Sequence, residues 1–124
     1  MDKRRYRRLE CALPVKVRQI PSRSEDVVKE FIIRNLGPEG AYITGDEIFE
    51  QDTLLELEFD LQGGGALPDE VDKIKATAVV RWKRFTDEEK GMGLQFLKVS
   101  EFGKQKISVY IIRKILEYRQ GSGK

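Results

Sequence analysis

The chain contains no histidine, and its 124 residues include one cysteine, one tryptophan and four prolines. The absence of histidine removes the commonest general base and the commonest metal ligand, so neither a metal site nor serine or cysteine hydrolysis is expected. The single cysteine, Cys11, excludes an internal disulfide framework and is typical of a reducing compartment. No apolar run approaches the roughly 18 residues that span a bilayer, and the basic N-terminus is not followed by the apolar stretch of a secretory signal. These absences favour a soluble, cytoplasmic, non-enzymatic protein without membrane insertion.

Positive charge is concentrated at the N-terminus. Residues 1–8 contain five of the 23 lysines and arginines and one of the 21 acidic residues, so the remaining 18 basic and 20 acidic residues sum to −2. A basic arm on a slightly acidic body predicts that an anion is bound at one place, whether a nucleic acid, a membrane surface or a small phosphate ligand. The body has no basic stripe with interleaved aromatic residues, which argues against a nucleic acid partner.

Period-two alternation of apolar and polar residues predicts that most of the body is β-strand. In one such segment Leu55, Leu57, Phe59 and Leu61 share a face, and in another the apolar residues recur from Ile74 to Trp82, which places Trp82 on a core face. The predicted strands cover residues 13–19, 27–34, 41–44, 54–61, 73–83 and 91–96. Short strands separated by turns predict an all-β fold, an antiparallel sheet closed into a small barrel or sandwich.

The end of the chain has a different period. From Ser100 onward apolar residues recur at helical spacing, which predicts one C-terminal helix with Ser100 as its N-cap and Glu101 near the positive end of the helix dipole. The predicted stripe consists of Phe102, Ile107, Ile111, Ile115 and Tyr118, widened by Val109, Ile112 and Leu116. We therefore expect a flexible arm at residues 1–10, one domain at 11–120 and a disordered tail at 121–124.

Three sequence features occur in a recognisable order. They are the basic run at residues 4–8, the pattern Asn35-x-Gly37-x-x-Gly40 after the second strand, and the segment 78–82 followed by 91–96. Together they resemble the PilZ domain, the bacterial receptor module for cyclic di-GMP, over nearly the whole chain. The resemblance implies a six-stranded antiparallel PilZ-type β-barrel with one C-terminal α-helix, in agreement with the strand pattern. It also implies a bacterial, cytoplasmic signalling module that is not an enzyme and needs no cofactor besides its ligand.

The PilZ family has two ligand motifs. Arg4 and Arg8 fit the first, RxxxR, and Arg5 doubles its first arginine. Asn35 and Gly40 fit the second, Asp/Asn-x-Ser-x-x-Gly, but Gly37 occupies the serine position. The candidate ligand-binding residues are therefore Arg4, Arg5, Arg8, Asn35, Gly37 and Gly40, with Arg7, Arg34, Arg81 and Trp82 as additional candidates near the motifs; no catalytic or metal-ligating residue is expected.

These residue types suit a ligand that carries two phosphates and two guanines. The arginine fork binds phosphate oxygens and the guanine edge, so an arginine arm can wrap such a ligand and become ordered by it. Asn35 offers a donor and an acceptor to a guanine edge, and Gly40 permits a positive φ and a close backbone approach. Gly37 lacks the serine hydroxyl, and one neutral hydrogen bond is worth roughly 0.5–1.5 kcal/mol, about a tenfold change in affinity at most.

Two functions follow from these motifs. The first is a cyclic di-GMP receptor whose arm changes conformation on binding and thereby regulates a protein partner in motility, exopolysaccharide production or a similar output. The alternative is a degenerate PilZ adaptor that acts through protein contacts without nucleotide binding, which the glycine at position 37 would favour.

Overall fold

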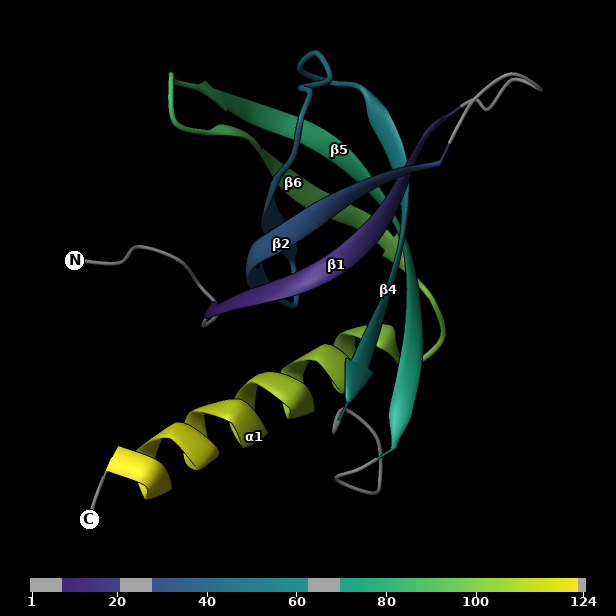
Figure 1. The fold of residues 1–124 in the computed structure, drawn as a ribbon. Coiled ribbons are helices and arrows are strands. Elements are labelled where there is room, and N and C mark those ends of the chain that lie inside the picture. Colours follow the sequence, from purple (N-terminus) through teal and green to yellow (C-terminus); the bar gives the residue numbers. More distant parts are fainter. Residues whose placement is uncertain (1–7, 21–27, 63–69, 123–124) are drawn as a thin grey trace.

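The computed structural model describes residues 8–20, 28–62 and 70–122, with side chains described as far as Tyr118. Six strands wrap into a barrel, and one long helix lies across one end of it (Figure 1). The elements are β1 (Leu9–Ile20), β2 (Lys29–Gly37), β3 (Gly40–Thr44), β4 (Leu54–Gln62), β5 (Val71–Phe85), β6 (Lys90–Val99) and α1 (Gly103–Ser122). The predicted six-stranded barrel with a C-terminal helix is confirmed.

The barrel is closed in the order β1-β2-β3-β6-β5-β4, and every neighbouring pair is antiparallel. The first strand and the helix both extend beyond the predicted domain boundaries of residues 11 and 120. Leu9 and Glu10 already pair with β2, so the predicted flexible arm does not include them. Helix α1 continues through Gly121 and Ser122, so these two residues are helical rather than a disordered tail. The remaining parts of the predicted arm and tail, residues 1–7 and 123–124, lie outside the described residues.

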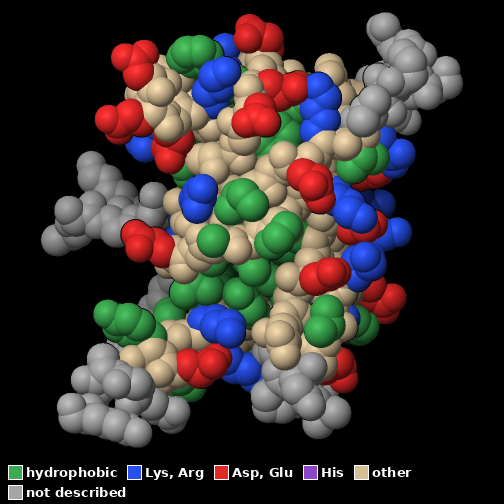
Figure 2. Space-filling view, viewed as in Figure 1, with side chains coloured by type: hydrophobic (Ala, Val, Ile, Leu, Met, Phe, Trp, Pro, Cys, Tyr) green, Lys and Arg blue, Asp and Glu red, His purple; other side chains and the backbone are tan. Residues whose placement is uncertain are grey.

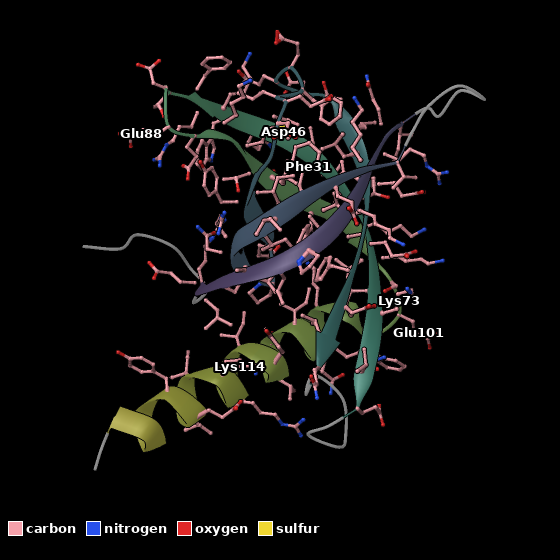
Figure 3. The ribbon with its side chains drawn as sticks, in the orientation of Figure 1. Phe31, Asp46, Lys73, Glu88, Glu101 and Lys114 are labelled. Atoms are coloured by element: carbon pink, nitrogen blue, oxygen red, sulfur yellow. The ribbon has the colours of Figure 1, made fainter. Side chains whose placement is uncertain are left out.

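The core lies inside the barrel and is built by the alternating strand faces. Leu55, Leu57, Phe59 and Leu61 of β4 are all buried, as the alternation predicts. Burying each such side chain stabilises the fold by roughly 1.5–3 kcal/mol. Phe31 of β2 lies in the same interior (Figure 3). Apolar side chains also gather where the barrel meets α1, with charged side chains around them (Figure 2).

Helix α1 closes one end of the barrel with only the first part of its predicted stripe. Ile107, Tyr110 and Ile111 are buried, and Ile115 packs against the core, whereas Phe102 and Tyr118 are exposed. A helix of 20 residues is about 30 Å long, so its C-terminal half extends past the barrel (Figure 1). The widening residues Ile112 and Leu116 are exposed as well. No helix in the described part of the chain is both long enough and apolar enough to cross a bilayer.

The predicted helix start at Ser100 is wrong. Ser100 accepts a hydrogen bond at its Oγ from the Lys75 backbone N–H (3.2 Å), and its own N–H donates to the Lys75 carbonyl (2.8 Å). Ser100 therefore extends the contact between β6 and β5, and Gly103 begins the helix after Phe102, whose φ is 60°. Glu101 precedes the helix, and no acidic residue lies in its first turn.

Trp82 does not lie on the core face that the alternation predicts. A β-bulge between Val80 and Trp82 places two residues of β5 opposite one residue of β6. The extra residue reverses the in-and-out order along the strand. Val80 is therefore buried, while Trp82 lies on the outer face with 46% of its surface exposed.

Candidate functional site

The second motif forms a tight hairpin rather than a loop. Strand β2 continues to Gly37, which pairs with Gly40 of β3, and Pro38 and Glu39 make a two-residue turn between them. Asn35 therefore lies within a strand, half-buried, opposite Glu10 on one side and Tyr42 on the other. Strand pairing on both sides holds the Asn35 backbone in place.

The structure brings one residue of each motif together. Arg8 donates a hydrogen bond from Nη1 to Oδ1 of Asn35 over 3.0 Å, although 27 positions separate them in sequence. The antiparallel register explains the contact, because Glu10 pairs directly with Asn35 and Arg8 lies two residues before Glu10. Arg4, Arg5 and Arg7 lie outside the described residues.

Gly40 is required by the barrel itself. A Cβ atom at Gly40 would lie 2.1 Å from the Leu94 carbonyl oxygen, because Gly40 pairs directly with Gln95 of β6. Its φ is outside the left-handed range, so the positive φ that glycine permits is not adopted here. Two contacts also hold the neighbouring turn in place. The Phe96 N–H donates to the Glu39 carbonyl (2.8 Å), and Nζ of Lys104 in α1 lies 3.4 Å from the Glu39 carboxylate. The hairpin is therefore fixed to both β6 and α1.

A row of residues runs from the motif across the outer face of the barrel. Asn35 pairs with Tyr42, Tyr42 with Gly93, and Gly93 with Trp82. Residues directly opposite each other in neighbouring strands point to the same face of a sheet. The Tyr42 and Trp82 rings are stacked, with centroids 5.2 Å apart and planes 10° from parallel. Tyr42 is not predicted from the sequence pattern, although the two glycines of the Gly91-Met92-Gly93 segment signal a close approach by other groups.

The two additional arginine candidates within the described residues are held by polar neighbours. Arg81 lies at the bulge beside Trp82 and donates from Nε to Oε1 of Gln95 over 2.6 Å. Arg34 donates from Nε to Oγ1 of Thr44 over 3.0 Å. Arg81 is therefore next to the aromatic pair, whereas Arg34 is held by Thr44 of β3.

Electrostatics around the aromatic pair favour fixed protonation states. Burial, followed by the hydrogen bond to Glu89, raises the pKa of Tyr42 to about 12, and Arg84 opposes this shift. The same hydrogen bond, which the Tyr42 hydroxyl donates to Oε2 of Glu89 over 2.5 Å, lowers the pKa of Glu89 below its usual value, with a further lowering by Arg84. At neutral pH the phenol stays protonated and the carboxylate stays charged.

The Cys11 thiol is protonated at neutral pH. Burial raises the pKa of the Cys11 thiol to about 11, against smaller lowering effects of the Leu13 backbone hydrogen bond and the Arg34 charge. No group of three or more histidine, cysteine, aspartate or glutamate side chains that could hold a metal ion occurs within this part of the chain. The motif residues and the aromatic pair can together bind a ligand through arginine charge, an amide group and an aromatic surface.

A groove of about 690 Å³ lies on a different side of the barrel, over β1, β4, β5 and β6. Lys73 and Glu101, close in sequence to its lining residues Lys75 and Ser100, are labelled on that side in Figure 3. Glu88, at the end of the β5–β6 hairpin, lies at the opposite side. Arg18 pairs with Glu56, and Lys75 lies 4.0 Å from Glu58, so these charges are paired along neighbouring strands. We therefore do not assign the anion site to this groove.

Comparison with known proteins agrees with the geometry. The family model of the PilZ domain matches residues 2–113. Among curated protein sequences there is no match. Among solved structures, the inhibitor of motility MotI/DgrA of Bacillus subtilis is similar, with a TM-score of 0.74 and 20% identity over 96% of this chain and 54% of that chain. The PilZ domain of YcgR from Escherichia coli, solved with c-di-GMP, has a TM-score of 0.67 and 14% identity over 99% of both chains.

A third similar structure is the MrkH–c-di-GMP complex of K. pneumonia, with a TM-score of 0.65 and 18% identity over 100% of this chain and 56% of that chain. The chain thus spans about half the length of MotI/DgrA and of MrkH. At these identities the structural likeness shows the fold alone.

Proposed function

The chain belongs to the PilZ domain family, and from this we propose that it is a receptor that binds cyclic di-GMP beside the β2–β3 hairpin. PilZ domains are regulatory binding modules rather than enzymes, and two of the similar structures contain c-di-GMP. The proposed ligand-binding residues are Arg4, Arg5, Arg8, Asn35, Gly37 and Gly40, with Arg7, Arg34, Arg81 and Trp82 around them.

The observation that carries the proposal is the hydrogen bond between Arg8 and Asn35. It joins the two motifs at one point of the barrel surface, so a ligand held there meets both. The guanidinium is a planar fork of N–H donors, and Arg8 binds Asn35 through one of them. This fork geometry suits phosphate oxygens and the O6 and N7 edge of guanine.

Asn35 contributes through its amide. Its Oδ1 accepts from Arg8, and within the described residues its Nδ2 group makes no hydrogen bond. That amide nitrogen has two N–H donors, which suit guanine O6 or N7. An aspartate in this place would instead accept from guanine N1 and N2 with charge assistance, so Asn35 predicts weaker binding than aspartate would give.

Gly37 weakens the site without abolishing it. The missing hydroxyl removes one neutral hydrogen bond, worth roughly 0.5–1.5 kcal/mol, or at most about tenfold in affinity. Binding would order the arginine arm against the barrel and change the surface that a protein partner meets. The similar MotI/DgrA structure is described as an inhibitor of motility, and a motility or exopolysaccharide output is proposed for this chain as well.

Isothermal titration of the full chain with cyclic di-GMP tests the proposal. We expect saturable binding by the wild type and at least a tenfold loss for Arg8→Ala, because a charge-assisted contact is removed. Arg18→Ala is the matched control: it removes the same charge from β1, where Arg18 pairs with Glu56 on the other side of the barrel. No heat and no chemical-shift change at high ligand concentration would contradict the receptor function.

The second candidate function is an adaptor that acts through protein contacts alone, and the glycine at position 37 favours it. Gly37→Ser separates the two candidates. A gain in affinity over a measurable wild-type value supports a weak but working site. If neither protein binds cyclic di-GMP, the adaptor function is favoured.

A further inference from the structure

Trp82 is held in an arrangement that the bulge alone does not explain. Its ring lies across β6 above Gly93, where a Cβ atom would be 2.0 Å from Cε2 and 2.1 Å from Nε1 of the indole. Tyr42 covers one face of this ring in a nearly parallel stack. Even with this ring stacked on it, 46% of Trp82 remains exposed to solvent.

Tyr42 is itself fixed from three directions. Gly91 lies beneath it, since a Cβ atom at Gly91 would be 2.1 Å from the Tyr42 hydroxyl oxygen. Glu89 accepts the hydrogen bond from that hydroxyl, and the Arg84 guanidinium lies over the ring, 5.5 Å from its centroid. Only 6% of Tyr42 is exposed. The tyrosine is therefore part of the folded body, whereas the tryptophan is at its surface.

The stack lies next to the proposed ligand site. Tyr42 is the direct cross-strand partner of Asn35, and Arg81 beside Trp82 reaches Gln95, the partner of Gly40. An exposed aromatic side chain offers a stacking surface to a purine, because every base has a π-face.

We propose that Tyr42 is a positioning residue for the ligand: it holds the Trp82 ring in place above Gly93 so that the exposed surface of the indole receives a purine base of cyclic di-GMP. This inference rests on the proposed function. Tyr42 acts through Trp82 and does not touch the ligand. Without the tyrosine, the indole gains alternative rotamers, and binding must first restrict them.

A double-mutant cycle in the full chain tests the proposal, with cyclic di-GMP affinity as the measurement. Tyr42→Leu is expected to weaken binding by about 3- to 10-fold, the range that corresponds to one aromatic pair. In a Trp82→Leu background the same substitution is expected to have no further effect, because the residue it positions is gone. Tyr42→Phe keeps the stacked ring, and we expect it to recover most of the affinity lost in Tyr42→Leu.

A second variant keeps the test decisive if Tyr42→Leu fails to fold. Gly93→Ala leaves Tyr42 intact and displaces the indole, which is half exposed and can move into solvent. We expect a similar loss of affinity. Trp82 is the only tryptophan, so its fluorescence anisotropy in the ligand-free protein should fall in both variants as the ring becomes mobile.

The outcomes separate this inference from the function on which it rests. If the wild-type protein does not bind cyclic di-GMP, both fail. If the wild type binds but Tyr42→Leu weakens binding equally with and without Trp82, the tyrosine has only a structural role and this inference alone is overturned. Unchanged affinity in Gly93→Ala, together with a displaced indole, would overturn it as well.

Discussion

Replacing Gly40 with alanine tests whether this motif glycine serves the barrel or only a ligand. The added Cβ would lie 2.1 Å from the Leu94 carbonyl oxygen and 3.2 Å from its carbonyl carbon. Both atoms belong to the β6 backbone, which is paired on its other side with β5. Neither can turn away as a side chain would, so β3 and β6 must separate at this point.

The cost follows from what that separation breaks. Losing up to two backbone hydrogen bonds costs about 0.5–1.5 kcal/mol each, and overpacking a well-packed site costs about 1–3 kcal/mol more. We therefore expect the free energy of unfolding to fall by about 3 kcal/mol. This is a large fraction of the roughly 5–15 kcal/mol that stabilises a domain.

Urea unfolding followed by far-UV circular dichroism measures the change. With a denaturant slope of about 1–3 kcal/mol per molar urea, the midpoint should fall by roughly 1–3 M. Gly103→Ala is the matched control, since its Cβ would lie 2.2 Å from Cγ1 of Val99, the end of a side chain that can change rotamer. A wild-type midpoint in Gly40→Ala, with cyclic di-GMP binding lost, would refute this reasoning and assign the glycine to the ligand.

Three further predictions concern Tyr42, the helix and the cysteine. Because the folded-state pKa of Tyr42 is raised to about 12 from an ordinary value of 10.0, its contribution to stability is present below pH 10 and lost as the pH rises towards 12. Tyr42→Phe should weaken this alkaline loss in urea midpoints measured from pH 9 to 12, and an unchanged pH profile would contradict the assignment. Ile107→Ala should cost about 2–5 kcal/mol of unfolding free energy because the side chain is fully buried. Ile112→Ala, at a position 57% exposed, should change it by less than about 0.5 kcal/mol, and equal losses would show that α1 packs differently. Since burial raises the pKa of Cys11 to about 11 from 9.0, its thiolate fraction at neutral pH is about 100-fold lower, and a thiol reagent should label it far more slowly than free cysteine. Labelling at the rate of free cysteine would contradict this.

Patterns along the chain were enough to predict the strands, the helix and the family. Alternation over β4 and the first part of β5 depends only on which neighbouring residues are apolar, so the strands and their buried faces could be read directly. Helical spacing likewise predicted α1, and the arginine run with Asn35 and Gly40 pointed to the PilZ domain. These patterns can be recognised along the chain without knowing which strands pair.

The assembly of the site depends on how the strands pair in three dimensions. The extra residue at the Val80–Trp82 bulge turned the tryptophan from the core face to the outer face, and alternation cannot show where a strand gains a residue against its partner. Register between β1 and β2 brought Arg8 to Asn35, and register between β2 and β3 set Tyr42 opposite Asn35. These contacts join residues far apart in sequence, so they follow from strand pairing and packing rather than from the composition of any one segment.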